Sequence, residues 1–220
     1  SIWHRVGYVN WGYEAIGRFQ NWEQIANYPI DNDRKGNRTV VPGDIMYKDQ
    51  NNDGVINYLD ERPIGYRVDS TPTLNFGINL SASWKGFDLA MDWTGSGMTS
   101  WNQCYETARP FQNDGNSPDE VLKDAWHLSD IWDANSPLIP GKYPMIRLNT
   151  DETSAYDKSS YWLHNVTYLK LRNLEVGYTF PKTWLNKTGI SNLRLFVSGT
   201  NLLTLSNLSV MDPECASDNG

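Results

Sequence analysis

The most regular pattern in the chain is an alternation of apolar and polar residues over Leu74–Trp84. Every even position in this stretch carries an apolar side chain, and every odd position carries glycine or a small polar residue. Because successive side chains of a β-strand point to opposite faces, this alternation predicts a strand with one apolar face. Lys85-Gly86 is typical of a two-residue turn, and the alternation resumes over Phe87–Thr94. The sequence therefore predicts an antiparallel hairpin with one apolar and one polar face.

Two environments suit such a hairpin. A soluble sheet packs its apolar face on a core, whereas a transmembrane barrel turns that face to lipid and its polar face to water. The strand length matches the roughly 9–11 residues that cross a bilayer. Trp84, Phe87 and Trp93 lie near the ends of the hairpin, where barrels carry aromatic girdles. These details favour the barrel, although the hairpin alone leaves both interpretations open.

A second hairpin is predicted towards the end of the chain. Its apolar residues fall at odd positions up to Leu171 and at even positions from Leu174. A shift of one residue turns a strand over unless an irregularity absorbs it, so we predict a β-bulge at Arg172-Asn173. Residues 182–189 then form a short turn or helical piece, and a further strand covers residues 192–201.

Between the hairpins, residues 97–160 are predicted to form a long loop region that is rich in Asn, Asp, Pro and Trp. Ser117–Glu120 has the form of a capping box with proline at the first helical position, which predicts a short helix over residues 118–128. Tryptophans such as Trp126 and Trp132 either pack beneath this loop or face a ligand, and packing is the usual role of any single one.

Thirteen residues, Asp49–Glu61, carry the signal of a metal site. Oxygen-bearing side chains occupy loop positions 1, 3, 5, 9 and 12, with glycine at position 6 and isoleucine at position 8. This is the spacing of a calcium-binding loop, although position 12 is Asp rather than the usual Glu. The alternative is a metal-free turn in which the same side chains cap backbone amides. The expected calcium ligands are Asp49, Asn51, Asp53, the Val55 carbonyl and Asp60, with Asn57 acting through water.

Composition narrows the classes of function. The chain has 220 residues and a formal net charge of −7, so it lacks the excess of Lys and Arg that nucleic-acid binding requires. Cys104 and Cys215 leave a single long-range disulfide open. His4, His127 and His164 are isolated, and no catalytic or phosphate-binding motif occurs. We therefore expect neither a nucleic-acid-binding protein nor an enzyme.

Several motifs, in one order along the chain, resemble the C-terminal part of SusC/RagA-type TonB-dependent outer-membrane transporters. Together they extend from about Gly12 to Glu214, and such a collinear set is far more specific than any one motif. The matching segments are Pro42–Asp49 with Asn51, Asp53–Ile56 and Asp60; Pro63–Gly65 with Thr71–Thr73 and Phe76-Gly77; Trp84–Leu89; Tyr168–Leu174 with Gly177–Thr179; Gly189-Ile190 with Leu193–Gly199 and Asn201-Leu202; and Asp212–Glu214.

The resemblance implies an all-β fold, in which antiparallel strands form part of a transmembrane β-barrel with long extracellular loops and one short helix. Residues 1–220 would be a C-terminal barrel segment, without the plug, the TonB box, the early strands and the final strand. It also implies location in the cell outer membrane, energy supply through TonB, a SusD-like surface lipoprotein as partner, and import of oligosaccharides or sometimes peptides. In that family, the calcium-type loop would lie outside the membrane.

Two other functions use the same features. A soluble, calcium-stabilised carbohydrate-binding β-sandwich would account for the ten tryptophans and for the metal loop. A dockerin-like interaction module would account for the Asp at loop position 12, but dockerins need a duplicated loop and flanking helices, and this chain has one loop. Detergent dependence distinguishes the transporter segment from the sandwich, because a sandwich is soluble and monomeric without detergent.

Overall fold

The structure is a computed structural model that describes residues 9–66, 72–112, 115–148, 152–186, 189–208 and 211–215. The chain divides into two compact units. The loop unit comprises Ser1–Ser70, Ser100–Asn165 and Cys215–Gly220, and the sheet unit comprises Thr71–Thr99 and Val166–Glu214. Each unit is described by itself below.

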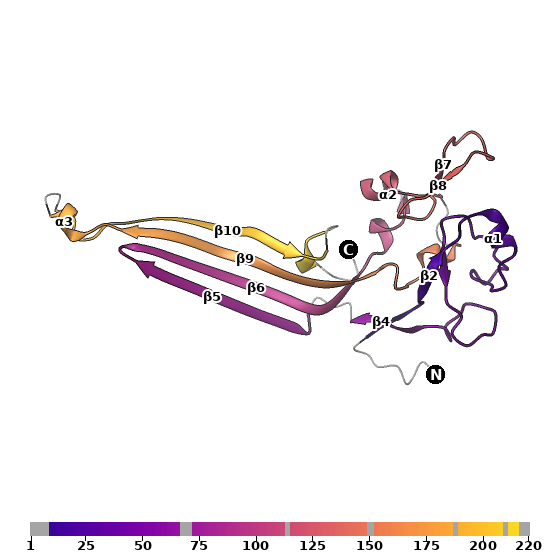
Figure 1. Ribbon diagram of the computed structural model, residues 1–220, viewed down its shortest axis with the longest axis horizontal. Helices are drawn as coiled ribbons and strands as arrows, with labels where there is room; N and C mark the ends of the chain where they lie inside the picture. The colour runs from indigo at the N-terminus through magenta and orange to yellow at the C-terminus, as the bar shows by residue number, and fades with distance from the viewer. Residues whose placement is uncertain are drawn as a thin grey trace. The chain divides into compact units, whose positions relative to one another are not determined.

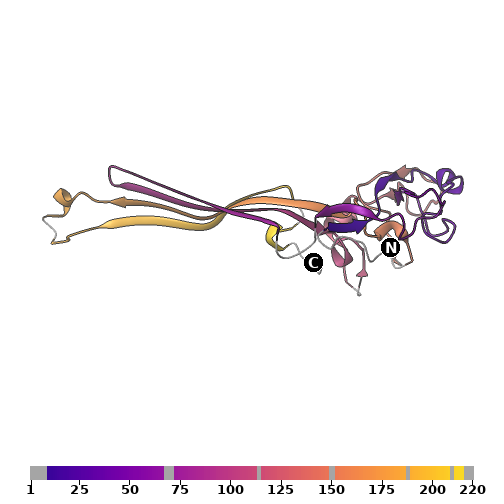
Figure 2. The ribbon, with the colours of Figure 1, turned by 90° about the horizontal axis from the view of Figure 1, so that it is seen from below.

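The sheet unit is built on four long strands in the order β10-β9-β6-β5, which run side by side in Figures 1 and 2. Strand β5 pairs antiparallel with β6, and β9 pairs antiparallel with β10. The hairpin turn at Lys85-Gly86 has positive φ at both residues, +48° and +90°, as a type I′ turn requires. The predicted hairpin is confirmed. The strands are β5 (Leu74–Trp84), β6 (Phe87–Asn102), β9 (Leu163–Thr179) and β10 (Arg194–Ser206).

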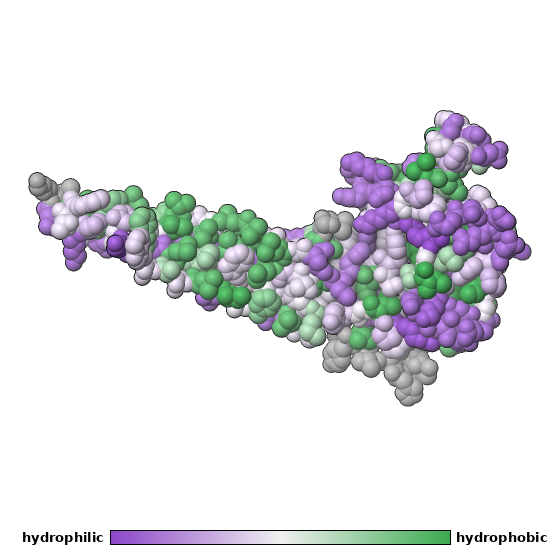
Figure 3. All heavy atoms as spheres, in the orientation of Figure 1, coloured by the Kyte–Doolittle hydropathy of each residue, from purple (hydrophilic) through white to green (hydrophobic). Residues whose placement is uncertain are grey.

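The two faces of this sheet differ as the alternation predicts. In the β5–β6 register, Leu80 lies opposite Met91 on one face, and Asn79 lies opposite Asp92 on the other. The apolar side chains of β5 are not packed on a core: Leu74, Phe76, Ile78 and Leu80 are 41–49% exposed. Figure 3 shows hydrophobic residues gathered along the strands. The apolar face of the sheet is therefore an open surface of the described residues.

The polar face carries a network of charged and amide side chains across strands. Arg194 of β10 contacts Glu175 of β9 at 2.6 Å (Nη2 to Oε1) and Asp88 of β6 at 3.2 Å (Nε to Oδ1). Further along, the Asn173 amide donates to Asp92 at 3.2 Å. These side chains satisfy one another on a face that is otherwise too polar to be buried in an apolar medium.

The register of the β9–β10 pair shifts between Thr200 and Leu203, opposite Arg172. An irregularity at this height was predicted from the change of phase in β9, and the position is confirmed. The extra residue, however, belongs to β10: Asn201 and Leu202 lie opposite one residue of β9, and Asn201 has a φ of +53°. The predicted piece after β9 contains a helical turn, α3 (Lys182–Leu185).

A turn after β10 folds back on the polar face of the sheet. It is a 3-10 helix, Pro213–Cys215, preceded by Asp212. The ammonium group of Lys170, whose side chain is almost fully buried, lies 2.9 Å from the Glu214 carboxylate and 3.2 Å from that of Asp212. Arg172 also pairs with Glu214. Two carboxylates thus neutralise two cations beside the β9–β10 irregularity.

The loop unit combines short strands, short helices and an aromatic core. Strand β1 pairs with β4, β2 with β3, and β7 with β8, all antiparallel. The helices are single turns. The elements are β1 (Val9–Gly12), β2 (Ala15–Arg18), α1 (Trp22–Ala26), β3 (Ile45–Tyr47), β4 (Arg62–Tyr66), α2 (Asp119–Lys123), β7 (His127–Leu128), β8 (Leu138–Ile139) and the 3-10 helices Tyr105–Thr107 and Ser154–Tyr156.

The predicted helix over residues 118–128 is wrong in its length and in its cap. Helix α2 covers only Asp119–Lys123, its N-cap is Pro118, and no side chain caps it. The helix ends because the chain turns into other contacts: the Asp124 carbonyl accepts from the Tyr143 amide at 2.9 Å, and residues 127–128 form β7. Helix α1 was not predicted, although its N-cap Asn21 accepts from the Gln24 amide at 2.8 Å.

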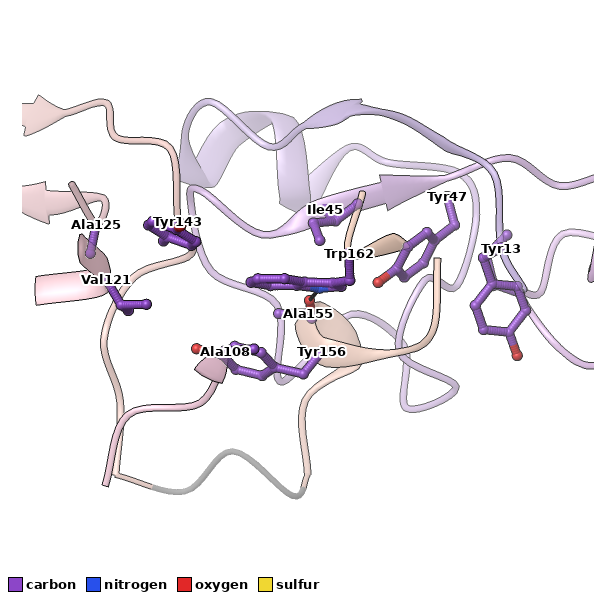
Figure 4. Close-up of a cluster of buried hydrophobic side chains, with 11 residues drawn as sticks. Tyr13, Ile45, Tyr47, Ala108, Val121, Ala125, Tyr143, Ala155, Tyr156 and Trp162 are labelled. Atoms are coloured by element: carbon purple, nitrogen blue, oxygen red, sulfur yellow. Dashed lines mark hydrogen bonds between the residues drawn. The ribbon is translucent and has the colours of Figure 1, made fainter. Parts of the chain in front are cut away.

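Trp162 lies at the centre of the core of the loop unit (Figure 4). Its ring stacks near Tyr156 (centroids 5.6 Å apart) and Tyr143 (6.2 Å), and its indole N–H donates to the Ala155 carbonyl at 2.9 Å. The indole polar atom is therefore satisfied although the residue is buried. Of the two tryptophans named in the loop prediction, Trp126 is buried as the simpler interpretation had it, whereas Trp132 is 90% exposed and does not pack beneath the loop.

Two further observations bear on the predictions. None of the described helices is long and apolar enough to cross a membrane. The Cys104–Cys215 disulfide, left open by the sequence, involves a side chain outside the described residues, that of Cys215.

Candidate metal-binding loop

Three carboxylates of the loop between β3 and β4 come together as the sequence predicts. Oxygen atoms of Asp49, Asp53 and Asp60 all lie within 4.8 Å of one another. Asp60 is fully buried, Asp49 is half-buried and Asp53 is exposed. The group is therefore open to solvent on the Asp53 side and anchored to the protein on the Asp60 side.

Backbone amides hold the two anchoring carboxylates in place. Asp49 accepts from the amides of Asn52 (2.7 Å) and Gly54 (2.8 Å). Asp60 accepts from the amides of Gln50 (2.8 Å) and Asn57 (2.9 Å). Because each carboxylate oxygen has two lone pairs, these bonds leave acceptor capacity free for a cation.

The remaining predicted ligands border the same group. The side-chain amide of Asn51 donates to the Asp53 carboxylate at 2.8 Å. The side-chain amide of Asn57 donates to the Val55 carbonyl at 3.2 Å. The side-chain oxygen of Asn51 accepts from the Asp53 backbone amide at 3.0 Å, so the nitrogen of Asn51 faces the Asp53 carboxylate and its oxygen is bonded to the loop backbone. Ligation by Asn51 would use the second lone pair of that oxygen.

The chemistry of this donor set fits a hard divalent cation. Three carboxylates, an amide oxygen and a main-chain carbonyl form an all-oxygen set of the kind that calcium prefers. Hydrogen bonds from the Val55 N–H and the Asn51 amide hold the pKa of Asp53 below its usual range. Asp53 is thus ionised at any pH near neutrality, as a ligand must be.

The loop is fixed to the core through Ile56 and Asp31. Ile56 is fully buried in the aromatic core, and its amide donates to the Asp31 carbonyl at 3.0 Å. The Asp31 amide in turn donates to the Gly54 carbonyl at 2.8 Å. Gly54, at loop position 6, has a φ of +84°, which explains why glycine is needed there. Sequence reasoning missed Asp31, because it lies outside the loop motif.

A second structural element that the sequence did not predict is the clamp around Arg18. Its guanidinium lies over the rings of Trp126 (5.5 Å) and Tyr161 (5.4 Å). It also donates to the carbonyls of Gly43, Gly141 and Lys142. Burial lowers the pKa of Arg18 from its ordinary value. This one side chain therefore ties β2 to Gly43 before β3, to Gly141-Lys142 and to Tyr161.

A buried ion pair lies on the same side of the core. Asp44, directly before β3, is fully buried and pairs with Arg147, which also donates to the Thr39 carbonyl and the Thr153 hydroxyl at 3.0 Å each. Burial raises the pKa of Asp44, and the Arg147 charge opposes this rise. Asp44 belongs to the Pro42–Asp49 motif, so its place in the sequence pattern has a structural reason.

Comparison with known proteins places these features in a family. No protein-family model matches the chain. TonB-dependent receptor P3 of Formosa agariphila is 30% identical over 207 residues, and the match covers 91% of this chain and 19% of the receptor. TonB-dependent receptor P26 of the same organism is 26% identical over 206 residues, covering 92% of this chain and 19% of that receptor. The chain thus spans about a fifth of the length of these curated relatives.

A solved structure of the RagAB peptide transporter shares the fold. The match has a TM-score of 0.56 at 20% sequence identity and covers 96% of this chain and 20% of that one. Similarity of this kind supports the all-β fold, and the curated relatives support the family. The chain is similar, over more than nine-tenths of its length, to a segment of TonB-dependent receptors, and its fold resembles that of a RagAB chain.

Proposed function

We propose that the chain is a C-terminal barrel segment of a TonB-dependent importer in the outer membrane. The main supporting observation is the β5–β6 hairpin, in which the apolar side chains of β5 are exposed and those of β6 up to Trp93 are exposed or half-buried. A lipid bilayer is the environment in which such a face is covered. On the other face, side chains of neighbouring strands bond to one another, with Arg194 contacting Glu175 and Asn173 donating to Asp92. Such a polar face suits a water-filled interior.

The soluble β-sandwich is the weaker proposal. A sandwich packs the apolar faces of two sheets together, whereas the described residues of β5 have no second sheet over their apolar face. Solubility of the complete protein tests the choice: an importer is extracted only with detergent and a sandwich protein remains soluble without it. Recovery of the complete protein in the soluble fraction of cells would reject the importer.

Within this proposal, the importer takes up oligosaccharides together with a SusD-like surface lipoprotein and draws energy from TonB. The curated relatives are receptors, so no enzymatic step is included. The RagAB structure is of a peptide transporter, which makes peptides the competing substrate class. Cells that lack the receptor should lose growth on oligosaccharide mixtures and keep growth on peptides. Loss of growth on peptides alone would reverse the substrate assignment.

We also propose that the Asp49–Asp60 loop binds calcium as a brace for the loop unit. The support is the all-oxygen donor set of Asp49, Asn51, Asp53, Val55 and Asp60, with Asn57 through water. Because no helix flanks the loop, we expect the weak affinity of extracellular modules, a Kd on the order of 0.1–1 mM.

Calorimetry tests the calcium site directly. The complete receptor should give a calcium heat that Asp49→Ala and Asp53→Ala abolish. Glu23→Ala is the matched control, because Glu23 is an exposed carboxylate in the first turn of α1, away from the loop. Equal calcium heats in the parent and all three variants would remove the site.

A further inference from the structure

One surface of the loop unit exposes large apolar side chains without any cover in the described residues. It is formed by α2, the β7–β8 hairpin and the irregular segment that contains Met145 and Ile146. Ile131 is 72% exposed and Trp132 90%, whereas isolated surface apolar residues in this unit are mostly near half exposure. Next to them is a cavity of about 460 Å³, lined mainly by apolar residues that include Leu122, Leu128, Ile131 and Met145.

The tip that carries Ile131 and Trp132 is held rigid by its own hydrogen bonds. The Trp132 amide donates to the Asp130 carboxylate at 2.9 Å, and the Asn135 amide donates to the Asp133 carboxylate at 2.9 Å. The Ser136 hydroxyl donates to the Asp130 carbonyl at 2.9 Å. A fixed loop presents an anchor side chain at little entropic cost, which is how rigid aromatic residues become binding hot spots.

The rim of this surface is strongly acidic. Residues 119–133 contain five carboxylates and one lysine, a net charge of −4 when His127 is neutral. The lysine, Lys123, is paired with Asp119 one helical turn earlier. Figure 3 shows hydrophobic residues between α2 and the β7–β8 hairpin, bordered by hydrophilic ones. The five carboxylates are those of Asp119, Glu120, Asp124, Asp130 and Asp133.

This combination selects among occupants. A second copy of the same surface would bring like charges together, which costs several kcal/mol. An anionic lipid surface is repelled for the same reason. A neutral sugar would stack on Trp132, but it would neither fill the apolar cavity nor pair with the carboxylates of the rim. A protein surface with a protruding aliphatic or aromatic side chain between Lys or Arg residues satisfies both features.

We propose that this surface, defined by Leu122, Ile131 and Trp132 with its acidic rim, is where the receptor docks the basic, apolar face of its surface lipoprotein. The inference rests on the proposed function, in which such a lipoprotein is the partner. It adds the location of the contact and the chemistry that the lipoprotein must present there.

The experiment measures the Kd between the purified complete receptor and its lipoprotein. Trp132→Ala should weaken binding at least tenfold, because it removes the most exposed anchor without touching the core. Trp22→Ala is the matched control: Trp22, on α1 of the same unit, is 55% exposed and lies outside the proposed surface. It should leave the Kd unchanged.

A second variant tests the charge and not the shape. Asp130→Asn with Asp133→Asn keeps the side-chain oxygens that accept from the Trp132 and Asn135 amides, so the tip keeps its form. It should weaken binding at 50 mM salt and much less at 500 mM, since screening already removes the attraction there.

The outcomes separate the two proposals. If the parent receptor binds no lipoprotein, the proposed function fails. If the parent binds and both the Trp132 and the Asp130/Asp133 variants bind equally well, the docking surface is wrong while the proposed function stands. A photo-crosslinker at position 132 that reacts with another part of the receptor, with a second receptor or with a glycan also overturns the docking surface.

Discussion

Two adjacent positions of β5 give opposite predictions for the same substitution. Leu80 lies on the apolar face opposite Met91, and Asn79 lies on the polar face opposite Asp92. Arginine at position 80 would face lipid, whereas arginine at position 79 would face the aqueous interior beside a carboxylate. Both variants introduce the same residue, with the same charge, at nearly the same depth in the strand. The pair therefore tests which face of the hairpin meets lipid.

The magnitude follows from the length of β5. Its 11 residues at about 3.4 Å each span roughly 37 Å, and a tilt of about 40° leaves roughly 28 Å along the membrane normal, close to the ~25 Å apolar band of barrels. Asn79 is the central residue, so Leu80 lies within one residue of the midplane. Leu80→Arg should cost about 2–4 kcal/mol, a factor of roughly 30 to 900 in the folding equilibrium. Asn79→Arg should cost about 0–0.5 kcal/mol, because cross-strand attraction to Asp92 offsets lost contacts.

The assay is folding of the complete receptor into lipid vesicles over a urea titration. Leu80→Arg should move the midpoint to clearly lower urea, and Asn79→Arg should leave it near the parent value. The reasoning is refuted if both variants shift equally, or if the substitution at position 79 is the more damaging one. Either result would mean that the apolar face of β5 does not meet lipid.

Three further predictions concern the loop unit. Arg18→Lys should destabilise it by about 1.5–3 kcal/mol, since lysine cannot keep the forked bonds to several carbonyls, and faster proteolysis of residues 141–161 would report this. Gly43→Ala should lower the free energy of unfolding by at least about 2 kcal/mol, because φ is +92° and a Cβ would lie 2.5 Å from the Trp126 ring. Gly36→Ala is the control: φ is +72° but the space around it is open, so the loss should be only about 1 kcal/mol. Thermal unfolding measures both. The lowered pKa of Asp53 means that its stabilising bonds are present above its unfolded pKa and are lost only as pH falls through its lower folded value. Asp53 should therefore stay ionised between pH 7 and 5, and calorimetry should show that the loss of calcium heat caused by Asp53→Ala is the same at both pH values.

The long strands could be predicted where each face meets a uniform environment. Along β5 and the first half of β6, one face is apolar and one polar, so a period of two is written directly into the sequence. The prediction stopped at Thr94, although β6 continues to Asn102, because residues 95–101 are buried on nearly every position and lose the alternation. Met98, with a φ of +55°, interrupts the pattern further. Where a strand is covered on both sides, its period no longer shows.

The loop unit was less predictable because its contacts are between distant residues. The ligand spacing of Asp49–Asp60 is local, and the structure brings its carboxylates together as expected. The early end of α2 depends on Tyr143, which is remote in sequence from Asp124. Arg18 carries no local signal at all, since its partners come from four separate segments of the chain. Local patterns specify turns and strands, and only tertiary contacts specify how such loops are clamped.

We expect the calcium-type loop to be braced mainly by its own hydrogen bonds, with the proposed calcium ion adding a smaller contribution to the free energy of unfolding. With a Kd on the order of 0.1–1 mM, 1 mM calcium stabilises the folded state by about 0.4–1.4 kcal/mol. Asp60, by contrast, is fully buried and satisfies the amides of Gln50 and Asn57. Leaving two such amides without an acceptor costs about 2–6 kcal/mol.

Asp60→Ala in the presence of a chelator should therefore destabilise the receptor more than the chelator alone destabilises the parent. Thermal unfolding of both proteins with and without chelator separates the two terms, because the hydrogen-bond loss persists when no metal is present. A chelator effect larger than the effect of Asp60→Ala measured in chelator would show that the metal, and not the backbone bonding, holds the loop. If Asp60→Ala has the larger effect, as we expect, the loop keeps its shape in calcium-poor surroundings, and calcium adjusts only its stability.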